Sequence, residues 1–162
     1  MRFILDLDDT LAQTTRDMRG DESRIGELTL APGAKEFLEF LKLRSEFHAL
    51  VTVGREEAQR AKIAHLNLSF DDIAIVPKTD DPSMKRAAIE KLAGEGDTRE
   101  QCVLVGDRLD RDISVGNALG LITVRMCLPE GRYSLIEPQN ESERPRYAVK
   151  DFFELMKLPL FS

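Results

Sequence analysis

Two carboxylates near the N-terminus carry the first chemical signal in the sequence. The apolar run Phe3-Ile4-Leu5 is typical of a β-strand, and Asp6 and Asp8 follow it directly. Side chains two positions apart on a strand point to the same side. Neighbouring carboxylates repel each other unless a cation lies between them, and Mg²⁺ binds one or two carboxylates while keeping waters that a phosphate can replace. The spacing therefore indicates a cation and phosphate site, and the alternative is an ordinary turn rich in Asp and Thr.

Further polar residues follow later apolar stretches. Thr52 lies at the end of the run 49–53, Gly106-Asp107 follows the run 102–105, and Asp112 comes five positions later. Each has an ordinary structural explanation, because Thr favours strands and acidic residues favour the first turn of a helix. Asp107 favours a functional explanation, since a bare carboxylate directly after a buried strand and a glycine is costly without a partner.

The elements that must position these residues alternate between strand and helix. The interval 12–27 is polar and has no clear periodicity, whereas helical spacing of apolar residues resumes after Pro32-Gly33. We predict strands at 3–5, 49–53, 73–76, 102–105 and 121–126, and helices at 34–41, 56–66, 83–92, 108–119 and 151–158.

This alternation predicts an α/β fold, a Rossmann-like three-layer α/β/α sandwich with a mainly parallel sheet. Ligands of such sheets bind at the carboxyl ends of the strands, near a topological switch point. Asp6, Thr52 and Asp107 each lie at the C-terminal end of a predicted strand. We therefore expect one edge of one sheet to bring these three side chains together.

Size and composition restrict the classes of function. The 162 residues fit one domain, and a formal net charge of −6, from 23 basic and 29 acidic residues, gives no electrostatic basis for binding nucleic acid or an anionic membrane. No apolar run approaches the roughly 20 residues of a membrane span, no signal-peptide pattern is present, and the two cysteines form no motif. We expect a cytoplasmic protein. The two histidines, His48 and His65, lack ligand-spaced partners, which argues against zinc hydrolases and Ser-His-Asp triads.

The chemical residues occur in an order that resembles the four sequence motifs of the haloacid dehalogenase superfamily. These are Asp6-x-Asp8-x-Thr10, then Val51-Thr52, then a lysine, then Gly106-Asp107-x4-Asp112. The resemblance extends over about residues 1–126, and the ordered set is far more specific than any single motif. It implies a phosphatase, because the true dehalogenases of the superfamily lack the second acid, here Asp8.

The resemblance also implies a role for each residue. Asp6 is the nucleophile that becomes an aspartyl phosphate, and Asp8 is the general acid and then the general base. The Thr52 hydroxyl donates to a phosphate oxygen. Mg²⁺ is bound by Asp6, by the backbone carbonyl of Asp8 and by Asp107, with Asp112 orienting its waters. Phosphoryl transfer depends chiefly on this kind of positioning and charge stabilisation.

The lysine of the third motif has two candidates. Lys78 follows the strand 73–76, and Lys85 lies in the first turn of the next helix. Lys85 stands 22 residues before Asp107, which resembles relatives that carry this lysine on the helix. A lysine at a helix start can direct its ammonium group back toward the strand ends. We favour Lys85, take Lys78 as a solvated loop residue, and expect neither in the core. Arg55 is interpreted as a solvated residue at a helix start.

The intervals between motifs leave no room for a cap domain over the site. Only 45 residues separate Asp6 from Thr52, and 32 separate Thr52 from Lys85. We expect a single capless domain, residues 1–162, with a flap-like segment at 12–30. Substrate selection then depends on this segment, on a neighbouring subunit of a homo-oligomer, or on a substrate large enough to cover the open site itself. We expect the substrate to be a phosphorylated small molecule or a larger phosphorylated molecule.

Two alternatives of other classes remain open. A phosphorelay receiver domain also combines acids, a Thr or Ser and a Lys with Mg²⁺ on a parallel sheet. Its acceptor aspartate follows a middle strand, however, whereas here Asp6 and Asp8 follow the first strand and Asp107 comes last. The other alternative is a catalytically silent phosphate-binding scaffold with the same fold. The presence of Asp6, Asp8, Thr52 and Asp107 argues against such a scaffold. A phosphatase assay with Mg²⁺ distinguishes it from an enzyme.

Overall fold

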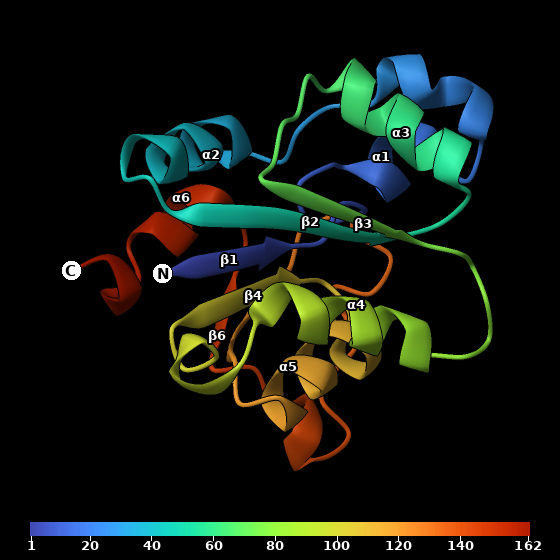
Figure 1. Ribbon diagram of the computed structural model, residues 1–162. Helices are drawn as coiled ribbons and strands as arrows, with labels where there is room; N and C mark the ends of the chain where they lie inside the picture. The colour runs from blue at the N-terminus through green and yellow to red at the C-terminus, as the bar shows by residue number, and fades with distance from the viewer.

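A six-stranded sheet forms the middle of the molecule in the computed structural model, which describes residues 1–162 (Figure 1). Every pair of neighbouring strands is parallel, and the order is β3-β2-β1-β4-β5-β6. The strands are β1 Arg2–Leu5, β2 Phe47–Val53, β3 Asp72–Val76, β4 Cys102–Gly106, β5 Ile122–Met126 and β6 Tyr147–Val149. The predicted α/β sandwich with a parallel sheet is confirmed, and the chain contains no separate cap domain.

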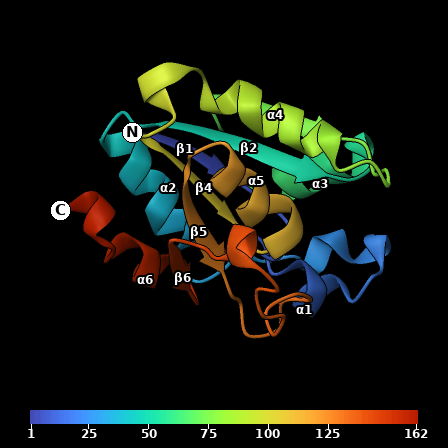
Figure 2. The same ribbon diagram turned by 90° about the horizontal axis from the view of Figure 1, so that it is seen from below.

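Helices cover both faces of the sheet, as Figures 1 and 2 show. The α-helices are α1 Thr14–Met18, α2 Ala34–Leu43, α3 Glu56–His65, α4 Ser83–Ala93, α5 Ser114–Ala118 and α6 Phe152–Met156. The shorter helical turns are η1 Glu22–Glu27, η2 Gly96–Thr98, η3 Leu109–Ile113, η4 Glu141–Glu143 and η5 Pro159–Phe161. None of the helices has the length and apolar composition that would let it cross a membrane.

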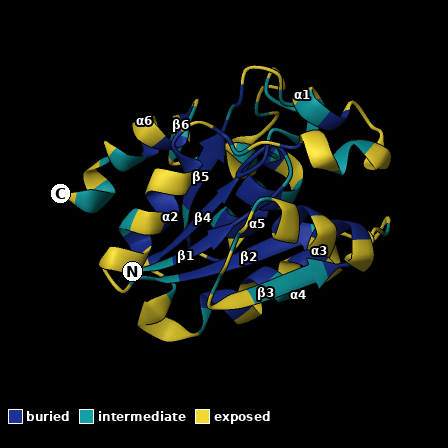
Figure 3. Cartoon of the chain, turned by 90° about the horizontal axis from the view of Figure 1, so that it is seen from above, coloured by how far each residue is buried: buried dark blue, intermediate teal, exposed yellow.

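Alternating side chains of the central strand divide the core into two layers. Phe3 and Leu5 of β1 belong to a cluster that also contains Phe37 of α2 and Phe152 of α6, whereas Ile4 belongs to the opposite cluster with α4 and α5. These three side chains of β1 are fully buried, and Figure 3 shows the inner strands, β2, β1, β4 and β5, as largely buried, whereas the edge strand β3 is more exposed. Because β1 is anchored in both layers of the core, it fixes the position of the loop that follows it, which carries Asp6 and Asp8.

The structure differs from the sequence-based prediction in three places. The interval 12–27 was predicted to lack regular structure, but it contains α1 and η1. The loop between β5 and α6 contains a short strand, β6, that no pattern indicated. The helix predicted directly after Asp107 begins with a π-helical turn, η3, before α5.

The flap, residues 12–30, leaves and rejoins the sheet layer at one point. Ala12 and Leu30 form an antiparallel bridge, and the Gln13 N–H donates to the Thr29 carbonyl at 3.0 Å. Within the flap, Asp17 accepts hydrogen bonds from the backbone and hydroxyl of Thr29. The flap is therefore a closed, internally bonded excursion beside α3.

Candidate active site

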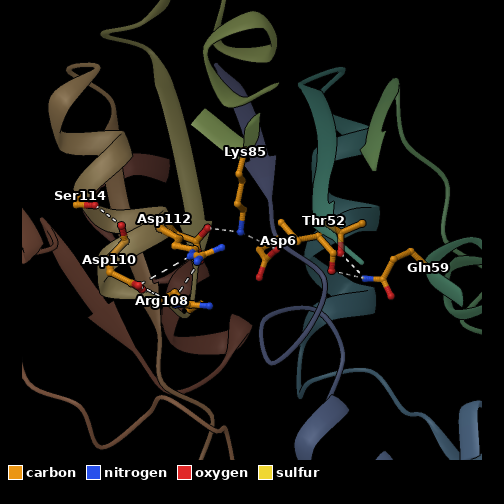
Figure 4. A network of polar contacts seen from close by, with 10 residues as sticks. Asp6, Thr52, Gln59, Lys85, Arg108, Asp110, Asp112 and Ser114 are labelled. Carbon is orange, nitrogen blue, oxygen red and sulfur yellow. Dashed lines mark hydrogen bonds and ion pairs between the residues drawn. The ribbon is translucent and has the colours of Figure 1, made fainter. Parts of the chain in front are cut away.

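Three adjacent strands deliver the predicted polar residues to one edge of the sheet. Asp6 follows β1 and donates its backbone N–H to the Val105 carbonyl of β4 at 3.0 Å. Thr52 lies near the end of β2, and Asp107 follows Gly106, the last residue of β4. Because β2, β1 and β4 are neighbours with parallel register, their carboxyl ends meet there (Figure 4). The predicted convergence of the three residues is confirmed.

Three of the acids form a buried cluster. One carboxylate oxygen from each of Asp6, Asp107 and Asp112 lies within 4.8 Å of the other two, and all three residues are buried. The Asp8 carboxylate is not part of this cluster. β1 ends at Leu5, so the strand alternation expected to align Asp6 with Asp8 does not continue through them.

Lys85 is the cation of the cluster. Its Nζ lies 3.2 Å from Asp6 Oδ1 and 2.5 Å from Asp112 Oδ1 (Figure 4). Lys78 is exposed and contacts none of these acids. The structure therefore brings Lys85 into the site and leaves Lys78 outside. The expectation that Lys85 lies outside the core is wrong, because only 5% of the residue is exposed. The first turn of α4 directs the side chain inward, under the strand ends.

A π-helical turn positions Asp112. Its Oδ2 accepts the Arg108 backbone N–H at 3.1 Å, which bends the carboxylate back toward the end of β4. Gly106 makes this approach possible, since a Cβ at position 106 would lie 2.5 Å from the Asp112 Cγ and Oδ2 atoms. In the pair Gly106-Asp107, the glycine thus leaves space for the Asp112 carboxylate and the aspartate contributes a carboxylate of its own. π-Turns of this kind recur at functional sites.

The burial of the cluster shifts its protonation equilibria. Burial raises the pKa of the Asp6 carboxyl to about 7, with Lys85 opposing the shift and Asp112 and Asp8 adding to it. Burial, together with Asp6 and Asp112, holds the pKa of Asp107 well above its usual value. Burial alone would lower the pKa of Lys85, but the neighbouring carboxylates outweigh it and raise that pKa. Lys85 therefore remains charged, while Asp6 and Asp107 resist ionisation.

The composition of the cluster fits a hard divalent cation. Three carboxylates against one ammonium leave two negative charges unbalanced when all are ionised. Buried charge of this kind is costly without a counter-ion. All the available ligand atoms are oxygens, which suits Mg²⁺ and not the softer metals. Asp6, Asp107 and Asp112 could hold such an ion.

Two residues of α3 were missed by the sequence analysis. Gln59 Nε2 lies 2.9 Å from Asp8 Oδ2 and 2.6 Å from Thr52 Oγ1, and Lys62 Nζ lies 2.8 Å from Asp8 Oδ1. The available signal was their spacing of three, which places both on the α3 face that also buries Ala58 and Ile63. Polar residues on a buried helix face need partners, and here the partners are Asp8 and Thr52.

The remaining candidates lie around the site or away from it. Arg55 is exposed at the N-cap position of α3, as expected, and its Nη2 is 2.5 Å from Glu22 Oε2 of the flap. His48 Nδ1 is 3.0 Å from the Glu46 carbonyl, and His65 Nε2 is 2.9 Å from the Leu28 carbonyl. Neither histidine contacts the acidic cluster.

The strand order also bears on the receiver-domain alternative. Receiver domains have the doubly wound order 2-1-3-4-5, whereas this sheet has the order β3-β2-β1-β4-β5-β6. The nucleophile candidate Asp6 follows the first strand, which is central in this sheet. The receiver alternative is therefore wrong at the level of topology.

Two curated phosphatases are similar to this chain in sequence. A glyceraldehyde 3-phosphate phosphatase of Methanopyrus kandleri is 33% identical over 110 residues, which are 65% of this chain and 46% of that protein. A ribulose-1,5-bisphosphate 5-phosphatase of Halopiger xanaduensis is 31% identical over 121 residues, 72% of this chain and 46% of that protein. The chain thus spans about half the length of these curated relatives.

The fold is also similar to that of solved structures. A hydrolase of the haloacid dehalogenase class from Bacillus subtilis, YfnB, solved with magnesium, superposes with a TM-score of 0.69 at 17% identity, covering 96% of both chains. The family model described as haloacid dehalogenase-like hydrolase matches residues 12–120, two thirds of the chain. With its strand-end acids, its lysine and its sheet order, the chain belongs to the haloacid dehalogenase-like hydrolase family.

Proposed function

We propose that this chain is a Mg²⁺-dependent phosphatase that hydrolyses a phosphomonoester through an aspartyl phosphate on Asp6. The observation that carries the proposal is the contact of Lys85 with Asp6 inside a buried oxygen cluster, with Thr52 at the neighbouring strand end. This arrangement supplies a nucleophile, a fixed cation, oxygen ligands and a hydroxyl donor at one place. Phosphoryl transfer depends on positioning and charge stabilisation, which these components supply without a histidine.

The first half-reaction transfers the phosphoryl group to the protein. An Asp6 carboxylate oxygen forms a bond to phosphorus as the bond from phosphorus to the leaving oxygen breaks. Asp8 donates a proton to that leaving oxygen, so the product departs as an alcohol. Lys85 balances the negative charge on Asp6 and on the transferred group, and the Thr52 hydroxyl donates to a phosphoryl oxygen.

The second half-reaction releases phosphate. Asp8, now ionised, takes a proton from water as the water oxygen bonds to phosphorus, and the bond between phosphorus and Asp6 breaks. Asp6, Asp107, Asp112 and the Asp8 backbone carbonyl would hold Mg²⁺, which when bound supplies positive charge to the phosphoryl oxygens. Asp6 returns to its carboxylate form, so the cycle is closed.

The relatives suggest a class of substrate. The two curated phosphatases are named for a phosphorylated three-carbon aldehyde and a sugar bisphosphate. We propose a small phosphorylated metabolite of this kind for the present chain, with the flap, residues 12–30, lying beside the open edge of the sheet. No part of the charge distribution favours nucleic acid as the substrate.

A phosphatase assay with and without metal tests the proposal. The purified chain should release phosphate from p-nitrophenyl phosphate and from a panel of sugar phosphates in Mg²⁺, and excess EDTA should abolish the release. Asp6→Asn should abolish turnover, because the nucleophile is lost. It should also abolish the added phosphoryl mass that an intact-mass measurement of the acid-quenched wild-type protein detects. Full activity in EDTA, or wild-type rates in Asp6→Asn, would overturn the mechanism. Phosphate binding without turnover would favour the silent scaffold.

A further inference from the structure

The Asp8 carboxylate is held by three side chains. Its Oδ1 accepts from Thr14 Oγ1 at 2.7 Å and from Lys62 Nζ at 2.8 Å, and its Oδ2 accepts from Gln59 Nε2 at 2.9 Å. Thr14 begins α1, whereas Gln59 and Lys62 lie one turn apart on α3. A carboxylate offers about four lone-pair directions, so about one direction on Oδ2 remains for a proton exchanged with substrate or water.

The same amide nitrogen also binds Thr52. Gln59 Nε2 lies 2.6 Å from Thr52 Oγ1, an interaction drawn in Figure 4. The orientation of the amide follows from chemistry, because an ionised Asp8 only accepts hydrogen bonds and its neighbour must be the –NH₂ group of Gln59. One amide therefore binds the carboxylate and the threonine with its two hydrogens.

This contact determines what the Thr52 hydroxyl can do. Its oxygen accepts from Gln59, so its single proton is not used in that bond and is free to be donated elsewhere. Thr52 is fully buried at the end of β2, beside the strand that carries Asp6. Gln59 thus prepares Thr52 as a donor for a phosphoryl oxygen while it fixes the acid–base group Asp8.

The surrounding chain reserves space for this side chain. Only 2% of Gln59 is exposed, and a Cβ at Gly54 would lie 2.8 Å from Gln59 Cδ and 3.1 Å from its Oε1. Lys62 is also buried, with Asp8 as its ion-pair partner. A buried amide and a buried ammonium both need partners to offset their desolvation. Their partners here are two residues of the candidate active site.

We propose that Gln59 is a positioning residue for both hydrolytic steps, which it serves by holding the Asp8 carboxylate and orienting the Thr52 hydroxyl. Lys62 fixes the second oxygen of Asp8 from the same helix. This assignment rests on the proposed phosphatase function and extends it to α3. In a chain without a separate cap domain, this helix on one face of the sheet supplies the support that keeps the acid–base group in place.

Two substrates with different leaving groups separate a positioning role from a general structural one. Phenyl phosphate needs a proton on its leaving oxygen more than p-nitrophenyl phosphate does, because nitrophenolate is a much weaker base. Gln59→Met keeps the unbranched shape and removes the donor. We expect kcat for phenyl phosphate to fall about 10-fold to 100-fold, the cost of a misplaced catalytic group, and kcat for p-nitrophenyl phosphate to fall clearly less.

The ratio of the two rates within one preparation does not depend on the folded fraction, so partial unfolding of the variant cannot imitate the effect. Gln59→Glu keeps the shape but faces Asp8 with an acceptor, and we expect it to change the ratio in the same direction and further. Arg60→Met is the matched control, because Arg60 is exposed on the same helix and pairs only with Glu56. Its ratio should equal that of the wild type.

Combination with Asp8→Asn completes the test. If Gln59 acts through Asp8, Gln59→Met should no longer change the substrate ratio when Asp8 is already replaced. Equal losses on both substrates in Gln59→Met, or an unchanged shift of the ratio in the double variant, would overturn the assignment. Absence of any Mg²⁺-dependent activity in the wild-type chain would instead overturn the proposed function on which the assignment rests.

Discussion

Single residues in the site balance charge within a small buried volume. Lys85 is the one ammonium beside Asp6 and Asp112, and Asp107 completes the cluster without a direct cation contact. Removing one member of a buried ion pair leaves the other uncompensated, which is costlier than losing a surface pair. Each member of this cluster is therefore expected to affect both stability and chemistry.

The two candidate lysines are separated by paired substitutions. Lys85→Met should lower kcat by about 10²-fold or more, the usual loss when a fixed stabilising group of a transition state is removed. Lys78→Met should leave kcat unchanged, because Lys78 is exposed and contacts none of the acids. Steady-state rates on p-nitrophenyl phosphate in Mg²⁺ measure both. The reverse ranking would assign the role to Lys78.

At the scale of elements, the turn after β4 converts a buried strand end into a ligand site. η3 holds Asp112 with a backbone N–H of Arg108, and Gly106 leaves the space that the carboxylate occupies. A regular α-helix over residues 108–119 was the expectation from the sequence. The π-turn gives the buried Asp112 carboxylate a hydrogen-bond donor, the Arg108 N–H, and a buried carboxylate needs such a partner.

Gly106→Ala tests this steric requirement. A Cβ at 2.5 Å from Asp112 must displace that carboxylate, so we expect half-maximal activity to require a higher Mg²⁺ concentration and the free energy of unfolding to fall by about 1–3 kcal/mol. Gly26→Ala is the control, because nothing lies within 4 Å of its would-be Cβ. Urea unfolding and a Mg²⁺ titration of the rate measure both variants. Equal behaviour of the two would contradict the role given to Gly106.

The elements differ in how far the sequence predicts them. Continuous apolar runs such as Phe3–Leu5 and Cys102–Val105 predict β1 and β4, because strands buried on both faces have no polar side. α1 and β6 were missed because they have five and three residues, respectively, too few for a periodicity to appear. Such segments are fixed by tertiary contacts, for example the hydrogen bonds between Asp17 and Thr29.

The candidate site also contains some residues that the sequence predicts and others that it does not. Asp6, Thr52 and Asp107 were predictable because parallel topology gathers strand ends at one edge. Gln59 and Lys62 were not, because their contacts with Asp8 cross between α3 and the loop after β1. Local pattern contains no information on which loop a helix faces.

For the whole molecule, the buried acids make stability depend on pH. The pKa of Asp6 is raised from 3.8 to about 7 by burial, and that of Asp107 is raised as well. A group whose pKa is raised in the folded state binds more protons there than in the unfolded chain. Its contribution is fully present below the unfolded value and is lost as pH rises through the folded value.

We therefore expect the metal-free protein to lose stability between about pH 4 and about pH 7, because over this range Asp6 is ionised in the unfolded chain but still protonated in the fold. The measurement is the urea midpoint in EDTA across this range. Saturating Mg²⁺ should flatten the dependence, because a bound cation offsets the ionised carboxylates. Asp6→Asn should weaken the dependence and leave the part due to Asp107, and a midpoint that rises with pH in the EDTA series would contradict the argument.

The closed base of the flap gives the molecule an exchangeable module. Gln13 and Thr29 meet through a backbone hydrogen bond of 3.0 Å, and between them Thr14 donates to Asp8 while Glu22 pairs with Arg55 of α3. The entropic cost of closing a loop grows only slowly with its length. Segments of other lengths can therefore replace the stretch between Thr15 and Thr29, while Thr14 keeps its contact with Asp8 and the strand ends that carry Asp6 and Thr52 keep their register. The tip of the flap is thus the segment that protein engineers can vary while the candidate site keeps its geometry.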